Sequence, residues 1–212
     1  MRRHIATGTL LTLLVLPACS GLTEIDWTDP GRESWQRPGD VVEALGLTPG
    51  ARVADLGAGE GYFVPYLAAA VEETGRVYAV EVDAELGEAL QARFADAPNV
   101  EVVLGAYDDP GLPDGAIDLV LLVNTYHHIE DRPAYFRSLR KNLSSIGRVV
   151  VIEPDAEQWG FFALWISSDH ASRAAAVVAE MEAAGYRHKR SVEFLPIQIY
   201  EIFVPQTEND QK

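Results

Sequence analysis

The stretch VADLGAGEGYF, residues 53–63, decides the fold that this sequence predicts. A short apolar run ends at Asp55, glycines follow at Gly57, Gly59 and Gly61, and a helical pattern begins at Tyr62. Glycine permits positive φ and close backbone approach to a ligand. The N–H groups at the start of a helix attract polar and anionic groups. The stretch therefore predicts a strand, a sharp turn and a helix that form a nucleotide-type cradle.

The glycine spacing separates this turn from two better-known ones. A dinucleotide fingerprint needs Gly-x-Gly-x-x-Gly, and a P-loop needs Lys after its last glycine, but Tyr62 stands at that position. The run resembles motif I of the class I S-adenosylmethionine (SAM)-dependent methyltransferases, where the glycine turn lies against the amino-acid part of SAM. The alternative is an ordinary glycine-rich turn. The resemblance spans roughly residues 32–204 and is greatest to exported bacterial methyltransferase-like lipoproteins.

The resemblance implies a Rossmann-like α/β fold: a seven-stranded methyltransferase sheet, mostly parallel, with a C-terminal antiparallel hairpin and helices on both faces. The sequence pattern predicts strands over residues 51–56, 76–83, 99–104, 117–124, 148–152, 186–195 and 198–204. It predicts helices over residues 41–46, capped by Asp40, and over 62–72, 84–94, 133–143 and 168–184. The two closing strands form the hairpin, which a plain dinucleotide domain lacks.

The cofactor that the resemblance implies is S-adenosyl-L-methionine. Glu81 ends the second predicted strand, and an ionised carboxylate can accept bonds from both ribose hydroxyls. Asp83 is the alternative acid, but we favour it as a helix N-cap. Many relatives carry Asp where this chain has Ala106, so Asp108 or Asp109 takes the adenine contact, or Tyr107 covers the ring. The implied cofactor-binding residues are Asp55, Gly57, Gly59, Gly61, Tyr62, Glu81, Asp108 and Asn124.

Polar residues at the end of the fourth predicted strand are expected near the methyl group of SAM. His127 and His128 are the candidate catalytic bases there, because imidazole titrates near neutral pH. Adjacent side chains should diverge, so we favour His128 for the pocket; surface and capping contacts are the alternative. The same divergence, and the lack of a third ligand, argue against a metal pair.

Three aromatic residues are candidate substrate contacts: Trp35, Tyr126 and Trp159. Trp35 precedes the first predicted helix, where this family often covers its pocket, but it is equally a surface-anchoring aromatic. Trp159 lies in an aromatic loop after the fifth strand, at residues 155–167. That loop favours an apolar or planar acceptor, with core packing or a membrane-facing surface as alternatives.

The first 18 residues predict a secretory signal peptide. Arg2 and Arg3 precede an apolar run over residues 5–16, which is too short to span a bilayer. Residues 16–19, Leu-Pro-Ala-Cys, resemble a bacterial lipobox with Cys19 as the lipidated residue; a plain signal peptide with an incidental cysteine is the alternative. Residues 19–31 would be the lipidated tether, 32–204 the methyltransferase domain and 205–212 a polar tail. We expect a cell-envelope location, lipid-anchored at Cys19.

The sequence therefore predicts a SAM-dependent methyltransferase acting on a small molecule or a protein side chain. The net charge of −15 argues against a nucleic-acid substrate. SAM is a cytoplasmic cofactor, so export favours the alternative of a non-catalytic ligand-binding module that retains the fold. A nicotinamide-dependent reductase and an isoaspartate methyltransferase are further alternatives, which the glycine spacing and the missing N-terminal signature disfavour.

Overall fold

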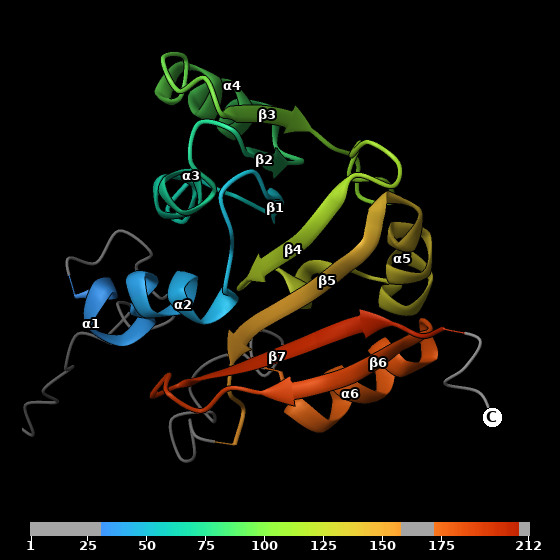
Figure 1. Cartoon of the computed structure of the whole chain (residues 1–212). Coiled ribbons are helices and arrows are strands. Elements are labelled where there is room, and N and C mark those ends of the chain that lie inside the picture. The colour runs from blue at the N-terminus through green and yellow to red at the C-terminus, as the bar shows by residue number, and fades with distance from the viewer. Residues whose placement is uncertain (1–30, 158–171, 208–212) are drawn as a thin grey trace, which may run out of the picture.

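A seven-stranded sheet runs through the molecule in the order β3-β2-β1-β4-β5-β7-β6 (Figure 1). The computed structural model describes residues 31–157 and 172–207. Neighbouring strands are parallel from β3 to β5, whereas β7 is antiparallel to both β5 and β6. This confirms the predicted sheet and its closing hairpin. The strands are β1 (Arg52–Leu56), β2 (Arg76–Glu81), β3 (Val100–Leu104), β4 (Ile117–Val123), β5 (Leu143–Pro154), β6 (Tyr186–Ser191) and β7 (Gln198–Pro205).

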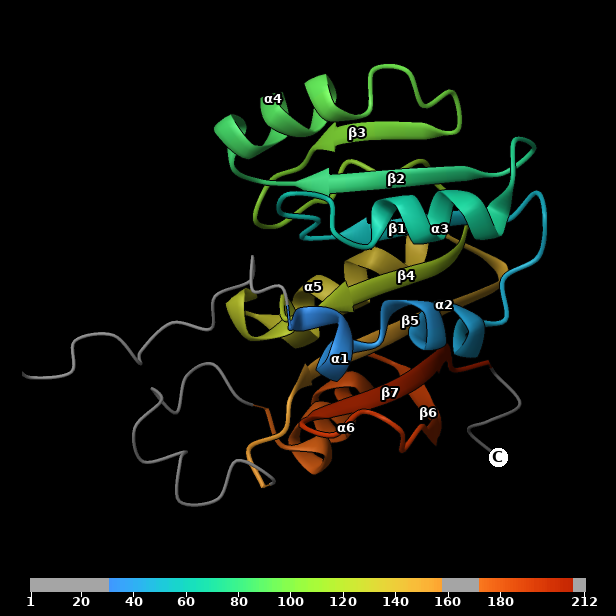
Figure 2. The same ribbon diagram turned by 90° about the vertical axis from the view of Figure 1, so that its left-hand side faces the viewer.

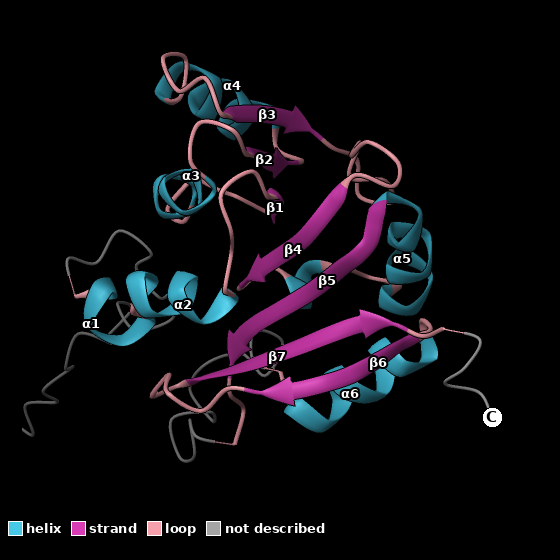
Figure 3. Cartoon of the chain, in the orientation of Figure 1, coloured by secondary structure: helices cyan, strands magenta, loops and turns pink. Residues whose placement is uncertain are grey.

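Helices cover both faces of this sheet (Figures 2 and 3). Side chains of α2, α3 and α4 join one buried apolar cluster, and those of α5 and α6 join the other. Two 3₁₀ turns, η1 and η2, flank α5. The helices are α1 (Arg32–Gln36), α2 (Pro38–Leu45), α3 (Val64–Val71), α4 (Ala84–Arg93), η1 (Tyr126–His128), α5 (Arg132–Leu139), η2 (Arg140–Asn142) and α6 (Ala174–Ala183).

The central strands β4 and β5 carry long apolar runs because the sheet is covered on both sides. Residues 119–122 of β4 and 149–152 of β5 are completely buried. A parallel strand shielded on two faces needs apolar residues at successive positions rather than at alternate ones. The middle of the sheet therefore has the sequences LVLL at residues 119–122 and VVVI at residues 149–152.

The order of strands reverses between β1 and β4. The chain moves outward from β1 through β2 to β3, then returns to add β4 on the other side of β1. In open α/β sheets, ligands bind beyond the carboxyl ends of the strands at such a reversal. The glycine turn follows β1, and residues 124–128 follow β4, so both predicted site segments lie at this edge.

The segment before β1 differs from the sequence prediction. It forms two helices, α1 and α2, rather than one capped by Asp40. Proline is favoured in the first helical turn, so Pro38 starts α2. Arg37, between the two helices, adopts a left-handed backbone with φ 48°. Asp40 lies inside α2 and pairs with the Arg37 side chain at 2.6 Å.

Other element boundaries also differ from the prediction. The predicted fifth strand, residues 148–152, is longer, because β5 begins at Leu143 where the sequence predicted helix. The buried Asn142 side chain donates to the Leu112 carbonyl at 2.6 Å and fixes the turn between η2 and β5. Strand β2 ends at Glu81, and Asp83 caps α4 by accepting bonds from the N–H groups of Glu85 and Leu86, as predicted.

Strand β6 forms one edge of the sheet. Arg187, Lys189 and Arg190 on this strand are exposed, whereas Tyr186 at its start is buried. Across residues 31–157 and 172–207, no helix has the length and apolar character to cross a membrane.

Candidate functional site

The turn after β1 has the backbone that its three glycines predict. Gly57, Gly59 and Gly61 adopt φ values of 75°, 55° and 78°. The N–H groups of Gly57 and Ala58 both donate to the Val80 carbonyl at 2.9 Å, which ties the turn to β2. The turn is therefore a defined cradle between two strands.

The three glycines serve different purposes. A Cβ on Gly57 would lie 2.4 Å from Thr125 Cγ2, and one on Gly61 would lie 2.6 Å from Phe94 Cε2. A Cβ on Gly59 would meet nothing within 4 Å. Gly57 and Gly61 thus allow the protein to pack against itself, and the turn is open on the side of Gly59.

The Glu81 carboxylate reaches the glycine turn from the end of β2. One oxygen accepts the N–H of Gly59 at 2.9 Å, and the other accepts those of Val82 and Asp83 at 2.8 and 3.1 Å. The Glu81 residue is 7% exposed. A largely buried negative charge is therefore fixed beside the open side of the turn, as required for the predicted ribose contact.

Asp55, the acid before the first glycine, is buried in the same region. Burial raises the pKa of its carboxyl group to about 7. The nearby Arg32 guanidinium opposes this shift, and the Glu81 carboxylate adds to it. The Asp55 carboxyl group therefore titrates near neutral pH.

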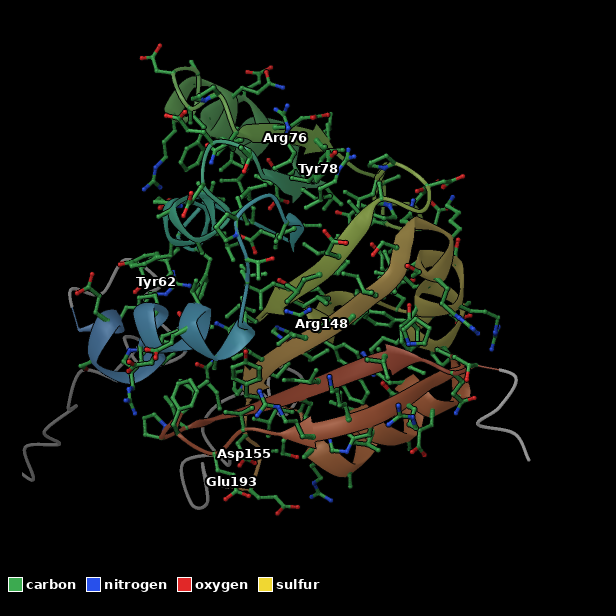
Figure 4. The ribbon with its side chains drawn as sticks, viewed as in Figure 1. Tyr62, Arg76, Tyr78, Arg148, Asp155 and Glu193 are labelled. Atoms are coloured by element: carbon green, nitrogen blue, oxygen red, sulfur yellow. The ribbon has the colours of Figure 1, made fainter. Side chains whose placement is uncertain are left out.

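Helix α1 covers the start of α3. The Arg32 guanidinium carbon lies 3.7 Å from the centre of the Tyr62 ring, a cation–π contact. Figure 4 shows Tyr62 beside α1. Glu33 accepts a bond from the Tyr66 hydroxyl at 3.2 Å. Trp35, a predicted substrate residue, lies on α1 and is half-buried.

Asn124 presents an unused donor at the end of β4. Its Oδ1 accepts a bond from Gln198 Nε2 at 2.8 Å, and Gln198 in turn lies 3.5 Å from the buried Gln36 amide on α1. Its Nδ2 is buried and has no hydrogen-bond partner among the described residues. The next residue, Thr125, contacts Gly57. A donor without a partner beside a glycine cradle suits a ligand that carries acceptor atoms.

The two histidines lie side by side in η1. Their ring centres are 4.0 Å apart, so the expectation that these neighbouring side chains diverge was wrong. His127 Nδ1 lies 2.6 Å from Oε2 of Glu153, and these side chains are 8% and 0% exposed. His128 is exposed. His127 therefore contacts a buried carboxylate, whereas His128, which the sequence favoured for the pocket, is exposed.

Tyr126 belongs to the core, which corrects its prediction as a substrate contact. The residue is 1% exposed and its ring stacks on Phe136 with centres 5.3 Å apart. Its hydroxyl donates to Glu180 at 2.8 Å. Tyr126 therefore faces α5 and α6, away from the glycine turn, and burial together with Glu180 raises the pKa of its hydroxyl.

The candidates for the adenine end lie on an exposed loop. Asp108 is exposed and Tyr107 is 84% exposed, whereas Asp109 is engaged by the Gly111 N–H at 3.0 Å and by Lys141 at 3.2 Å. Leu104, at the end of β3, is 58% exposed. Asp109 is thus held by two groups of the protein, whereas the side chain of Asp108 is exposed to solvent. Trp159 and Cys19 lie outside the described residues.

Metal ligation finds no support in residues 31–157 and 172–207. They contain no group of three or more His, Cys, Asp or Glu side chains arranged to hold a metal ion.

Sequence reasoning did not name Glu153, Gln198 or Arg32 as parts of the site. Glu153 had a signal, because it directly follows the apolar run of residues 149–152. Arg32 and Gln198 had no such signal in the sequence, because each joins the site through a contact with a distant segment of the chain.

The comparisons with known proteins agree with this geometry. Residues 54–151 match the family model described as a methyltransferase domain. The match covers a little under half of the chain and takes in the glycine turn, Glu81 and the end of β4. The crystal structure of a SAM-dependent methyltransferase from Aquifex aeolicus aligns with a TM-score of 0.74 and 26% identity, over 83% of this chain and 94% of that one. The fold and its neighbours support S-adenosyl-L-methionine as the cofactor of the domain.

The curated relatives match a shorter share of the chain and differ in the acceptors that their names give. The chain is 38% identical over 114 residues to a protein-L-isoaspartate O-methyltransferase from Methylorubrum populi, over 52% of this chain and 49% of that protein. It is 30% identical over 115 residues to phosphoethanolamine N-methyltransferase 1 from Arabidopsis thaliana, over 53% of this chain and 23% of that protein. The chain thus matches half or less of the length of these relatives.

Proposed function

We propose that this protein is a SAM-dependent methyltransferase that acts on a small molecule or a protein side chain. The observation that carries the proposal is the glycine turn itself, open at Gly59 and held by the Glu81 carboxylate at 2.9 Å. The methyltransferase domain assignment and the Aquifex aeolicus structure agree with it.

The residues present fit the cofactor. In our proposal Gly57, Gly59 and Gly61 form the cradle, and Asn124 Nδ2 donates to the amino-acid part of SAM. Glu81, which keeps acceptor capacity beyond its three backbone partners, accepts bonds from the ribose hydroxyls. The exposed side chains of Leu104 and Asp108 are the proposed contacts of the adenine.

Other predicted residues take supporting places in this proposal. Tyr62 and Asp55 border the cradle beneath α1, and Trp35 on that helix is a candidate contact of the acceptor. His127 and His128 lie on the side of β4, where the acceptor would approach the methyl group. SAM supplies an electrophilic methyl group when bound, and the protein orients the acceptor and removes its proton.

The test is the affinity of the chain for SAM, measured by isothermal titration. Gly59→Ala adds a methyl group on the open side of the turn and meets no protein atom within 4 Å. Gly115→Ala is the matched control, because Gly115 also has positive φ, at 63°, and open space around its Cβ, in the turn before β4. We expect Gly59→Ala to weaken SAM binding at least tenfold and Gly115→Ala to leave it unchanged. A wild-type chain that does not bind SAM at millimolar concentration would refute the proposal.

The second candidate is a binding module without catalysis. Two sequence features favour it: the predicted leader, and Ala106 in place of the acid common in this family. Methyl-labelled SAM incubated with a cell-envelope extract separates the two candidates. Labelled product that depends on Gly59 supports the enzyme, whereas SAM binding without any labelled product supports the module.

We further propose that the chain is exported and lipid-anchored at Cys19. The support is the apolar run over residues 5–16 and the lipobox-like residues 16–19. Expression in bacteria with radiolabelled fatty acid is the test. We expect label and membrane association in the wild type and neither in Cys19→Ser; unlabelled wild-type protein would refute lipidation.

A further inference from the structure

Glu153 is a completely buried carboxylate whose two oxygens both serve the segment after β4. It is the second-last residue of β5, and its Oε1 accepts the backbone N–H of Tyr126 at 2.7 Å, while Oε2 lies 2.6 Å from His127 Nδ1. Burying an ionised carboxylate is unfavourable unless it is paired and hydrogen-bonded. Both partners of Glu153 belong to η1, so the carboxylate fixes the position of this turn and of the His127 ring.

The chemistry of the pair sets the tautomer of His127. An ionised carboxylate only accepts hydrogen bonds, so the 2.6 Å contact places the imidazole proton on Nδ1 and a lone pair on Nε2. When Nε2 accepts a proton from an acceptor, Nδ1 of the resulting imidazolium lies 2.6 Å from the Glu153 carboxylate. Arg132 and Tyr126 also lie within electrostatic range of Glu153, and the centre of the His128 ring lies 4.0 Å from that of His127, with the two rings tilted by 42°.

The pair lies on the proposed acceptor side of the site. Thr125, two residues before His127, packs against Gly57 and donates toward its carbonyl at 3.4 Å. The His127 ring therefore belongs to the same short segment that closes the glycine turn. Glu180, by contrast, binds the Tyr126 hydroxyl and Arg132 on the far side of that segment.

We propose that Glu153 and His127 form a general-base pair for an acceptor whose methylated atom carries a proton, either a hydroxyl oxygen or an amine nitrogen. The inference rests on the proposed methyltransferase function. The acceptor's lone pair forms the new bond to the methyl carbon as the carbon–sulfur bond breaks, and its electrons stay on sulfur to give a neutral thioether. The acceptor's proton passes to His127 Nε2 and then to water. An acceptor without such a proton, a thioether or a tertiary amine, gains nothing from this pair.

The first test needs neither cofactor nor acceptor. The ¹⁵N chemical shifts of the histidine side chains report which ring nitrogen carries the proton. We expect His127 to be protonated at Nδ1 in the wild type and in Glu180→Gln, the matched control with a carboxylate close to Tyr126 but not to His127. In Glu153→Gln the tautomer should shift toward Nε2. A wild-type ring protonated at Nε2 overturns the proposal, and this result stands even if Glu153→Gln does not fold.

The second test uses methyl-labelled SAM and a panel of phenols, primary amines, thioethers and tertiary amines. We expect product only from the phenols and amines, with a kcat about 100-fold lower in His127→Asn and Glu153→Gln and SAM affinity within twofold of the wild type. The proposal is overturned if only thioethers or tertiary amines give methylated product. It is also overturned if no compound of the panel is methylated although the chain binds SAM. A chain that fails to bind SAM refutes the proposed function instead, while the tautomer result stays independent.

Discussion

Asn124 Oδ1 and Gln198 Nε2 lie 2.8 Å apart, and this hydrogen bond joins the end of β4 to the start of β7 across β5. It fixes the orientation of the Asn124 amide, because Oδ1 must face the donor. The Nδ2 group is thereby directed elsewhere, and it is the atom that finds no partner in the described part of the chain.

We expect Asn124→Asp to weaken SAM binding about tenfold or more. Aspartate keeps the acceptor for Gln198 and tolerates the φ of 55° at this position, but it replaces the donor with an acceptor. A lost hydrogen bond to a charged group accounts for a change of this size. Titration calorimetry measures it. Asn99→Asp is the control, because Asn99 donates to the Ala68 carbonyl far from the turn; equal losses in both variants would exclude a specific role for Asn124.

We expect Glu81→Gln to loosen the glycine turn. The carboxylate accepts three backbone N–H groups, and an amide nitrogen cannot replace an accepting oxygen, so the variant loses about 1–3 kcal/mol of unfolding free energy. Hydrogen exchange at the Gly59 amide should accelerate. Asp83→Ala removes the neighbouring cap of α4 and costs about 1 kcal/mol, but it should leave Gly59 exchange unchanged. The same exchange rate in all three proteins would contradict the assignment.

Asp55 should make the stability of the protein fall as pH rises toward neutrality. Its pKa is about 7 in the folded protein and about 3.9 in an unfolded chain. Between these values the folded state binds more protons, so the unfolding free energy decreases with rising pH and levels off above pH 7. Asp55→Asn removes this dependence. The stability difference between the variant and the wild type should grow from pH 4 to 7 in urea titrations; a constant difference would show that Asp55 titrates normally.

Alanine at the glycines of the turn should destabilise the fold to different extents. Gly59→Ala and Gly115→Ala meet open space, so each loses about 1–2 kcal/mol from the left-handed backbone alone. Gly57→Ala adds the overlap with Thr125, for about 1–3 kcal/mol more. Urea denaturation of the three variants gives the order. Similar losses at Gly57 and Gly59 would mean that Thr125 moves aside freely.

The sequence predicted the sheet, the glycine turn and the cap at Asp83, because each depends on local pattern. The glycine spacing and the apolar runs of β4 and β5 define their elements without knowledge of distant contacts. The sequence could not predict the contacts between distant residues. These join Glu153 to His127, 26 positions apart; Gln198 to Asn124, 74 positions apart; and Arg32 to Tyr62, 30 positions apart. Tyr126 was misassigned because the direction of a side chain in a 3₁₀ turn does not follow from the strand before it.

The exposed cations of β6 have a consequence for the behaviour of the protein in concentrated solution. An edge strand offers unpaired N–H and C=O groups to any other extended chain, and this is a common route to aggregation. Arg187, Lys189 and Arg190 place three positive charges along that edge. A second copy of β6 that approached in register would meet the same charges, so the strand repels its own pairing and discourages fibril-like growth from this side of the sheet.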